Sequence, residues 1–570
     1  MLPLNIESTH MKNLYVIAVL VWLGINVNAQ APEWEWARKA GGGAGSLGKS
    51  ISTDFSGNIY VTGYFYDAGE IVIFGETAMY SNVQSVFIVK YDSAGYVIWA
   101  NEATTNDNIS SDAGNCIKAD GNGDVYLAGF IGGHHMYFGD TLLANPDGWN
   151  IFIAKYDSSG KVMWVKGPEG IAAAQSISTD ADGNAYITGG FSSARIIFGN
   201  DTLTLLSGIT NAYVVSYTPY GNVLWARSAI GNSEAKAINT DTKGNSYITG
   251  SFSNDTVIFG NYVLTKNDSF HNTINIFTVK YDTVGNVIWA KSAGQNKHVW
   301  EAAMGKGIAT DADGNVYVRG YFSSRSISFG DILLTNGDTS GITEDIFIVK
   351  YDSSGNVIWA KGGGKIAPAA SQSISTDAFG NVYVVGCFPD TNIVFGNDTL
   401  INASSSGNND NIFIVKYDES GNVIWAKSAG GASTDFANGI TDDIGNVYIS
   451  GYFRAPEIIF NNDTLVNHTD KAFDFYIAKL GSGNVTSITD PVFSPVISVF
   501  PNPSIATFNF SQVNPGSSIQ IYNVLGEIIY SSIANSDNYR INLNSQAKGI
   551  YFYRVSDKGN DVGQGKIVLE

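Results

Sequence analysis

The sequence is poor in charged residues and in cysteine. Charged residues make up 15% of the 570 positions, against about 25% in an average soluble protein, and this excludes coiled coils and long charged helices. The two cysteines, Cys116 and Cys387, are too few for a disulfide scaffold or a four-thiolate zinc site. We expect both to be buried as small apolar residues.

Positive charge is also scarce. Lys and Arg number 33 against 52 Asp and Glu, which gives a net charge of −19. Because nucleic-acid affinity comes largely from Lys and Arg, we expect no nucleic-acid partner. The sequence is instead rich in glycine, with 63 residues, and 12% of it is aromatic. This composition excludes a disordered chain and favours short aromatic strands joined by tight turns.

The amino end has the pattern of a secretory signal. A basic start at Met11-Lys12-Asn13 precedes an apolar run over residues 14–25, and the small residue Ala29 follows. Twelve mostly apolar residues span about 18 Å of helix, which is shorter than the ~30 Å core of a bilayer. We therefore predict a signal peptide over residues 1–29, with Met11 as an alternative start, and no transmembrane anchor in the mature chain. A buried helix is the alternative interpretation.

Internal repetition is the strongest signal in the chain. A unit of the form Phe-Ile-Val-Lys-Tyr-Asp-x-x-Gly-Asn-Val-Ile-Trp-Ala places its tryptophan at positions 36, 99, 164, 225, 289, 359 and 425. A second unit, Thr-Asp-x-x-Gly-Asn-x-Tyr, places its tyrosine at positions 60, 126, 186, 247, 317, 383 and 448. Each unit therefore occurs seven times. The spacing exceeds the ~40–50 residues of the common propeller repeats, yet each copy has the strand content of one blade.

Each copy predicts four strands, and the ends of the array predict how it closes. In the sixth copy the strands are expected at 373–376, 381–388, 413–417 and 422–427, with Asp-x-x-Gly-Asn turns in the first and last hairpins. The seventh copy ends without its tryptophan strand, whereas Trp34–Lys39 is such a strand with no repeat before it. Pairing the two predicts an all-β, seven-bladed propeller over residues 30–482. An open solenoid is the alternative.

These repeats resemble a known family. The Asp-x-x-Gly-Asn-x-Tyr-Val-x-Gly turn and the Phe-Ile-Val-Lys-Tyr-Asp…Trp-Ala-Lys unit are similar to the bacterial β-propeller repeats called SBBP repeats, over roughly residues 32–480. The resemblance implies the propeller fold. It implies no chemistry, because the shared residues build turns and cores.

The carboxyl end predicts a second domain. A linker rich in Gly, Ser, Thr and Pro spans 483–495, and alternating segments over 496–570 predict a small β-sandwich. Its motifs resemble the C-terminal sorting domain of the type IX secretion system of Bacteroidetes-like bacteria, and they comprise Pro501, Asn502, Pro503, Gly526, Gly549, Tyr551 and Lys566. The resemblance implies export across both membranes, with the type IX machinery as partner, to the surface or the medium. An accessory carbohydrate-binding sandwich is the alternative.

Candidate ligand-binding residues lie in loops that differ between copies. In a propeller these loops share one face, opposite the Gly-Asn turns, and variable loops on a rigid scaffold commonly bind ligands. Trp149 and Trp300 lie in these loops. We expect them to stack on sugars or on a protein partner, and local packing within the loop is the alternative. Further candidate ligand-binding residues are His134, His135, His298 and Glu301. The alternative interpretation is that they are solvated loop residues without a binding role.

Two turns carry the beginning of a calcium-binding pattern. The oxygen-bearing residues are Asp180, Asp182 and Asn184 in one copy, and Asp311, Asp313 and Asn315 in another. No downstream Glu completes a loop, and other copies keep Gly-Asn without the second Asp, so turn formation is the favoured explanation. We therefore predict no cofactor, with calcium as the alternative.

No catalytic residue is assigned, because the sequence holds no nucleophile elbow, phosphate loop or clear carboxylate pair. The predicted function is an exported, monomeric binding or scaffold protein that engages a glycan or a surface protein through the variable loops. A secreted polysaccharide hydrolase or lyase with an active site at the channel mouth is the alternative, since propeller sites assemble from distant residues. A structural envelope component is a third reading.

Overall fold

The computed structural model divides the chain into two compact units, Met1–Asn484 and Val485–Glu570, and this division falls within the expected linker. All regular elements among the described residues are strands. The structure describes residues 31–481 and 498–569 apart from 67–70, 106–110, 147, 267–272, 295–301, 338–343, 366–372, 405–408, 444–445, 468–471, 501, 503, 524–527 and 558–559. The predicted signal peptide lies outside the described residues.

The first unit contains seven sheets in which four strands follow one order, and we call them sheets 1 to 7. Each begins with an inner strand, and the second strand pairs with it. The inner strands are β3 (Gly45–Thr53), β9 (Ala113–Ala119), β15 (Ala172–Thr179), β21 (Ser233–Thr240), β27 (Ala303–Thr310), β33 (Ser373–Thr376) and β39 (Asp435–Asp443). The second strands are β4 (Ile59–Tyr66), β10 (Val125–Ile131), β16 (Ala185–Phe191), β22 (Ser246–Phe252), β28 (Val316–Phe322), β34 (Val382–Phe388) and β40 (Asn446–Phe453).

The third and fourth strands complete each sheet. The third strands are β7 (Ser85–Tyr91), β13 (Asn150–Tyr156), β19 (Asn211–Tyr217), β25 (Asn275–Tyr281), β31 (Asp345–Tyr351), β37 (Asn411–Tyr417) and β43 (Asp474–Leu480). The fourth strands are β8 (Val97–Thr104), β14 (Val162–Lys166), β20 (Val223–Ser228), β26 (Val287–Ala293), β32 (Val357–Lys365), β38 (Val423–Ala429) and, for sheet 7, β1 (Trp34–Lys39). The four strands expected in the sixth copy are thus confirmed to within two residues at each end.

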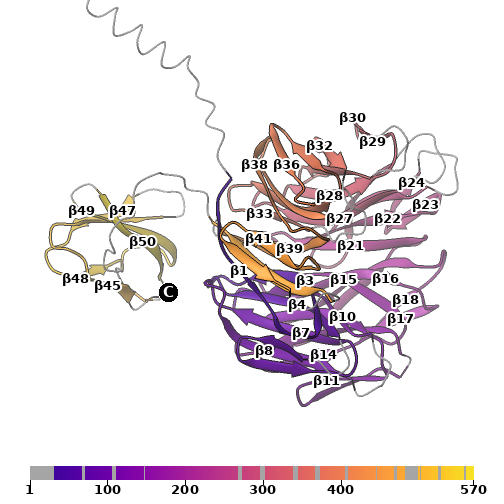
Figure 1. Cartoon of the computed structure of the whole chain (residues 1–570), viewed down its shortest axis with the longest axis horizontal. Helices are drawn as coiled ribbons and strands as arrows, with labels where there is room; N and C mark the ends of the chain where they lie inside the picture. The colour runs from indigo at the N-terminus through magenta and orange to yellow at the C-terminus, as the bar shows by residue number, and fades with distance from the viewer. Residues whose placement is uncertain are drawn as a thin grey trace, which may run out of the picture. The chain divides into compact units, whose positions relative to one another are not determined.

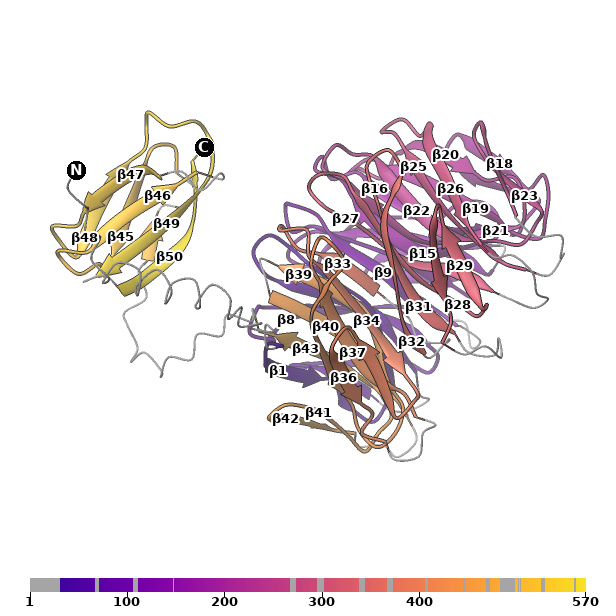
Figure 2. The same ribbon diagram turned by 90° about the horizontal axis from the view of Figure 1, so that it is seen from above.

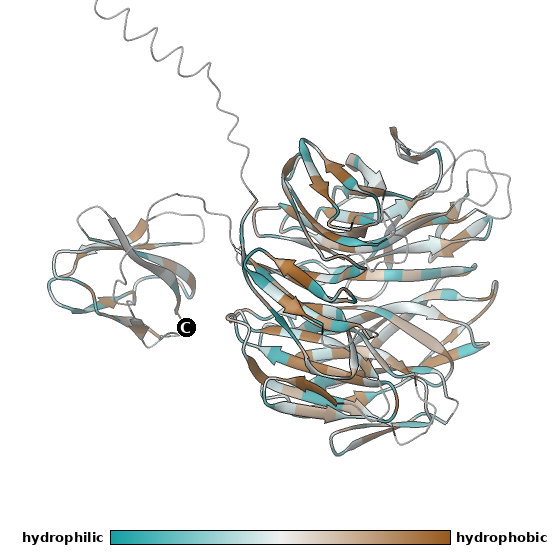
Figure 3. Ribbon diagram, in the orientation of Figure 1, coloured by the Kyte–Doolittle hydropathy of each residue, from teal (hydrophilic) through white to brown (hydrophobic). Residues whose placement is uncertain are grey.

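The second and third strands are buried on both faces, as their runs of adjacent apolar residues predict. Every residue of β13 and of β22 is buried, because neighbouring sheets cover them. Figure 3 shows hydrophobic stretches recurring along the strands of each sheet. Cys116 and Cys387 are free and buried, which confirms the expectation for both.

Sheet 7 contains strands from both ends of the array. β1 pairs antiparallel with β43, with Trp36 opposite Lys479 and Lys39 opposite Tyr476. The strand β1 lies among the strands of the last repeat in both ribbon views (Figures 1 and 2). This is the pairing that the missing tryptophan strand of the seventh copy predicts.

The inner strands contact one another in cyclic order. Each packs against the inner strand of the next sheet, and β39 of sheet 7 packs against β3 of sheet 1. Side chains tie this last junction: the hydroxyls of Thr53 and Thr441 lie 3.1 Å apart, and Asn438 Nδ2 donates to the carbonyl of Gly48 at 2.7 Å.

Five of the seven repeat tryptophans form hydrogen bonds between neighbouring sheets farther from the centre. Trp225 Nε1 donates to the carbonyl of Thr283, in the turn of the next sheet, at 3.0 Å, and Trp99, Trp164, Trp289 and Trp359 make equivalent bonds. The ring of Trp225 lies against Gly285, which has φ +82° and where an added Cβ would meet the indole at 2.7 Å. The repeated glycine of this turn therefore serves both the backbone conformation and the packing between sheets.

Each repeat also carries a short outer hairpin between its second and third strands. In sheet 2 this hairpin pairs with β8 of sheet 1 and extends that sheet to six strands, and the short strand β2 (Gly41–Gly42) pairs likewise with the first hairpin. The hairpins are β5 (Ile71–Phe74) with β6 (Thr77–Tyr80), β11 (His135–Phe138) with β12 (Thr141–Ala144), β17 (Arg195–Phe198) with β18 (Asp201–Thr204), β23 (Thr256–Phe259) with β24 (Tyr262–Thr265), β29 (Ser326–Phe329) with β30 (Ile332–Thr335), β35 (Asn392–Phe395) with β36 (Asp398–Ile401), and β41 (Glu457–Phe460) with β42 (Asp463–Val466).

The second unit consists of two sheets that share one core. One sheet has the order β44-β45-β48 and the other β47-β46-β49-β50, and buried residues of both, such as Phe508 and Ile519, form a single cluster. The strands are β44 (Ser498–Phe500), β45 (Thr507–Ser511), β46 (Ser518–Tyr522), β47 (Ile528–Ile533), β48 (Asn538–Asn542), β49 (Gly549–Asp557) and β50 (Asn560–Leu569).

Candidate functional site

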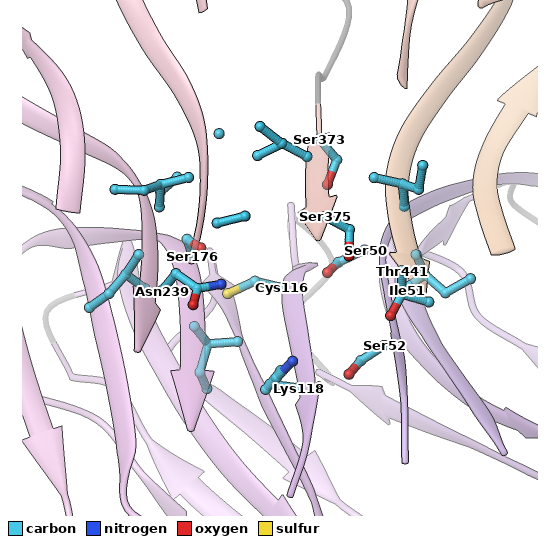
Figure 4. A pocket seen from close by; sticks show the side chains of 18 of the residues that line it. Ser50, Ile51, Ser52, Cys116, Lys118, Ser176, Asn239, Ser373, Ser375 and Thr441 are labelled. Carbon is cyan, nitrogen blue, oxygen red and sulfur yellow. The ribbon is translucent and has the colours of Figure 1, made fainter. Parts of the chain in front are cut away.

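The seven inner strands surround a central cavity of about 880 Å³. Residues from β3, β9, β15, β21, β27, β33 and β39 all line it, and Figure 4 shows Lys118 and Asn239 among the side chains that reach it from separate strands. A cavity of this size falls within the range that holds a small ligand or part of a larger one.

A β-bulge recurs in the inner strands and places a polar side chain in the cavity. In six sheets the pairing of the inner strand with the second strand skips one residue. A bulge re-aims the side chain of the extra residue. The skipped residues, which we call the bulge ring, all line the cavity and are Lys49, Asn115, Gln175, Lys236, Lys306 and Asn438.

The amides of the bulge ring hold neighbouring sheets together. Asn115 Nδ2 donates to the carbonyl of Ala174 at 3.0 Å, and Gln175 Nε2 donates to Glu234 Oε1 at 3.0 Å. Asn438 makes the bond to Gly48 described above. In three sheets the same position holds a lysine instead, namely Lys49, Lys236 and Lys306. A lysine has no side-chain amide, so it does not make this hydrogen bond to the next sheet.

Four lysines and three aspartates line the cavity of this acidic protein. Lys236 forms an ion pair with Glu234 at 2.7 Å. Lys49 and Lys118 have no carboxylate partner among the described residues. Burial lowers the pKa of both ammonium groups, and burial also lowers the pKa of Lys306, assisted by the nearby charge of Lys236 and opposed by Glu234 and Glu344.

The carboxylates that line the cavity are already engaged. Asp54, Asp311 and Asp377 lie at the turns that end their inner strands. Asp54 Oδ1 accepts bonds from two turn amides, and Oδ2 accepts from Asn58 Nδ2 at 2.8 Å and Tyr60 Oη at 3.0 Å. Asp311 Oδ2 lies 3.8 Å from Lys350 Nζ, and Asp377 Oδ2 lies 3.3 Å from Lys416 Nζ. These two carboxylates are therefore paired with lysines that do not line the cavity.

A group of aromatic side chains surrounds Lys49 on the face of the variable loops. Lys49 Nζ lies 5.4 Å from the ring centre of Tyr64 and 5.7 Å from that of Tyr452. The ring of Tyr452 in turn lies 4.9 Å from Phe436 and 5.0 Å from Phe473. All of these rings are partly exposed. The group, which we call the aromatic group, consists of Tyr64, Tyr66, Phe436, Tyr452 and Phe473.

The sequence reasoning missed the aromatic group, although a signal was present. Tyr64 and Tyr452 follow the repeated glycine of the second strand, and the same position is Gly190, Ser251 and Cys387 in other copies. Because the surrounding strand is nearly identical in each copy, this variation marks an inward-facing position that the fold leaves free to change. Tyr321 occupies it in sheet 5, where Lys306 Nζ lies 5.7 Å from its ring centre.

Of the predicted ligand-binding residues, three are described. Trp149 is 60% exposed with φ +52° and lies 5.4 Å from the ring of Phe130. His135 makes an edge contact with Tyr137 at 5.5 Å, and the carbonyl of His134 accepts a bond from Asn145. The structure therefore places both histidines in contacts of their own hairpin. Trp300, His298 and Glu301 lie outside the described residues.

The candidate calcium residues form turn hydrogen bonds. Asp180 Oδ1 accepts from the amides of Asp182 at 3.0 Å and Asn184 at 2.8 Å, and Oδ2 accepts from Asn184 Nδ2 and Tyr186 Oη at 2.8 Å each. Asp311 makes the same four bonds with Asp313, Asn315 and Tyr317. Among the described residues, no group of three or more His, Cys, Asp or Glu is arranged to hold a metal.

Two substitutions distinguish a purely structural turn at Asp180 from a calcium site. Asp180→Ala removes four accepted hydrogen bonds, and at a net ~1 kcal/mol or less for each partly exposed bond we expect a loss of about 2 kcal/mol in the free energy of unfolding. Asp182→Ala removes a candidate ligand but no turn bond, since only its backbone amide is used. Thermal melts of both variants with calcium and with chelator test this: a calcium-dependent shift that Asp182→Ala abolishes would overturn the turn explanation.

The residues of the predicted sorting motif are partly described. Asn502 Nδ2 donates to the carbonyl of Lys566, and Asn502 Oδ1 accepts from the amide of Val568, each at 2.8 Å. Tyr551 Oη donates to the carbonyl of Ala547, and Gly549 has φ +152°. Asn502 therefore joins the segment that follows β44 to β50, the last strand of this unit. Pro501, Pro503 and Gly526 lie outside the described residues.

Comparison with family models identifies both kinds of segment. Residues 498–570 match the model of the secretion system C-terminal sorting domain, and residues 35–64 match that of the β-propeller repeat. The chain carries SBBP propeller repeats and a type IX sorting tail. The tail indicates a secreted or cell-surface protein of a Bacteroidetes-type bacterium. Among the described residues, no helix is long and apolar enough to cross a membrane.

Known relatives add little about activity. The chain is 26% identical over 544 residues to an uncharacterised WD repeat-containing protein of Acanthamoeba polyphaga mimivirus, with 78% of this chain and 38% of that protein covered. It is 29% identical over 143 residues to the regulatory protein FlaEY of Caulobacter vibrioides, with 25% and 15% covered. The chain thus spans well under half the length of either relative.

Solved structures show distant likeness. The WD40 domain of Neurospora crassa Pan2 aligns with a TM-score of 0.37 and 10% identity, covering 80% of this chain and all of that domain. A protein of unknown function from Dyadobacter fermentans aligns with a TM-score of 0.35 and 9% identity, covering 78% of this chain and 99% of that protein.

Proposed function

We propose that the first unit is a closed seven-bladed propeller that serves as a binding module on an exported protein, with its ligand site on the face of the variable loops. The pairing of β1 with β43 and the cyclic contacts of the inner strands support the closed ring. Such a ring positions loops of distant repeats rigidly around one cavity, and this is the property that a binding face requires.

The aromatic group around Lys49 is the observation that carries this proposal. Five partly exposed rings lie at strand ends of sheets 1 and 7 on one face, next to an ammonium that lines the central cavity. Partly exposed rings provide flat apolar surfaces on which the apolar faces of sugar rings stack, and they also anchor protein partners. The exposed Trp149 on Phe130 adds a second such surface on sheet 2.

Binding to a glycan array tests this function directly. The combined change Tyr64→Ala and Tyr452→Ala removes two rings of the aromatic group, and we expect it to weaken binding roughly tenfold or more. Tyr220→Ala is the matched control, because Tyr220 is 82% exposed in a turn at the opposite ends of the strands. Equal loss in both variants, or no loss in the first, would count against this face as the site.

A polysaccharide hydrolase or lyase is the second candidate, and one carboxylate supports it. Burial raises the pKa of Glu344 to about 7, partly opposed by Lys306, and a carboxylic acid that titrates near neutrality suits general acid–base catalysis. Turnover of a bound polysaccharide that is lost in Glu344→Gln, with binding retained, would establish the enzyme. Retained binding without turnover in the wild type supports the binding module.

A further inference from the structure

We propose that the central cavity binds the anionic groups of an acidic saccharide, whose sugar rings stack on the aromatic group at the cavity mouth. This inference rests on the proposed function and deepens it, since it names the chemical class of the ligand. The shared chemistry is a carboxylate or a sulfate ester on a sugar chain.

The distribution of charge carries the first step. Four lysines from four different inner strands, Lys49, Lys118, Lys236 and Lys306, line one cavity of a protein whose net charge is −19. Of these four lysines, only Lys236 has a carboxylate within ion-pair distance among the described residues. The charge of Lys236 acts on Lys306, and an anion that enters the cavity relieves this repulsion between like charges.

The choice of residue in the bulge ring carries the second step. At this position Asn115, Gln175 and Asn438 each donate a hydrogen bond to the next sheet. A lysine there gives up the hydrogen bond that an amide makes to the next sheet and adds a desolvated charge, which costs stability. Lys49 and Lys306 gain contacts with tyrosine rings instead. Binding of an anionic ligand accounts for lysine at three of the six described positions, whereas the structural need of the fold is met by an amide.

The relation of the lysines to the aromatic rings carries the third step. Lys49 lies beside Tyr64 and Tyr452, and Lys306 lies beside Tyr321, so two of the ammonium groups that line the cavity lie next to tyrosine rings. Lys118 comes three residues after its bulge position along β9, roughly 10 Å farther toward the turns. A ligand that stacks at the mouth can therefore present one acidic group to Lys49 or Lys306 and a further one to Lys118.

Three oligosaccharide probes with the same ring framework test the proposal in the full chain. They are an oligogalacturonate, the same oligomer with its carboxylates reduced to alcohols, and a sulfated form of the reduced oligomer. We expect at least one charged probe to bind roughly tenfold more tightly than the neutral probe, and the advantage to shrink as salt is raised. The two charged probes separate a carboxylate ligand from a sulfate ligand.

Lys118→Gln is the decisive variant, because Lys118 lies away from the aromatic group and makes no described ion pair. We expect it to weaken binding of the charged probe roughly tenfold, while binding of the neutral probe stays unchanged. Lys118→Arg keeps the charge and should restore affinity even if the glutamine variant melts earlier. Lys166→Gln, an exposed change on an outer strand, is the matched control and should change neither affinity.

The outcomes distinguish this inference from the function on which it rests. Equal affinity for charged and neutral probes, with loss in the double tyrosine variant, overturns the anionic ligand and leaves the saccharide-binding face in place. Full affinity of Lys118→Gln for the charged probe also overturns the role of the cavity. Failure of all three probes to bind overturns the acidic saccharide as the ligand, while binding to the glycan array decides the proposed function separately.

Discussion

Deletion of residues 33–39 should lower the melting temperature of the propeller unit by roughly 10 °C or more. The deletion removes β1, leaving sheet 7 with three strands and exposing the edge of β43. About five ladder hydrogen bonds at ~1 kcal/mol each are lost, and burial of Trp34 and Trp36 contributes ~3 kcal/mol apiece at most. The sum approaches the whole stability of a typical domain, which is ~5–15 kcal/mol.

Two single substitutions should lower the melting temperature by less than the deletion does. Trp36→Ala keeps the strand but removes an indole that is 8% exposed, so it should produce an intermediate shift. Glu35→Gln breaks only the ion pair with Lys479, in which the Glu35 side chain is 43% exposed, and surface pairs of this kind contribute about 0–1 kcal/mol. Calorimetric melts of the three variants provide the measurement. An unchanged melt after the deletion would contradict closure of the ring by β1.

Removal of residues 496–570 should leave the protein inside the outer membrane of a host with a type IX system. The match of residues 498–570 to the sorting-domain model implies that this unit contacts the secretion machinery. The two units have separate cores, so the truncated propeller should melt as before while surface exposure is lost. Fractionation of cells into periplasm, surface and medium, with immunodetection of the propeller, measures this effect.

A transplanted tail is the complementary control. Residues 485–570 joined to a periplasmic reporter should carry the reporter to the surface or the medium. A disruptive change at Asn502, whose side chain bonds the backbone of Lys566 and Val568 in the last strand of the unit, should reduce that transport. Normal export of the truncated protein would show that the tail is dispensable and would contradict its role as the sorting signal.

Much of the fold could be predicted from the sequence because its signals are local. The Asp-x-x-Gly-Asn turn sets its own geometry, since one aspartate side chain accepts bonds from residues two to six positions later, as at Asp180. Repetition then supplied the strand count of each sheet, and the lone Trp34–Lys39 strand predicted its pairing with β43. Both inferences depend on residues that are close in sequence or identical between copies.

The candidate site could be predicted only in part. Trp149 stood out because it interrupts the repeat, and the structure places it exposed on Phe130. The residues around Lys49 did not stand out: Tyr64, Phe436 and Tyr452 look like ordinary strand aromatics. They come from strands nearly 400 residues apart in the chain, and no local pattern links them.

The sequence by itself determined the strands, the turns, the repeat and the sorting tail, because hydrogen bonds and apolar packing between near neighbours specify each of them. Only the tertiary structure decided which side chains share the cavity. A single skipped residue in each of three inner strands turns Lys49, Lys236 and Lys306 toward the cavity, and the register of a strand against its neighbour is set by packing across the whole sheet. The chemistry of the site is therefore a property of the assembled sheets.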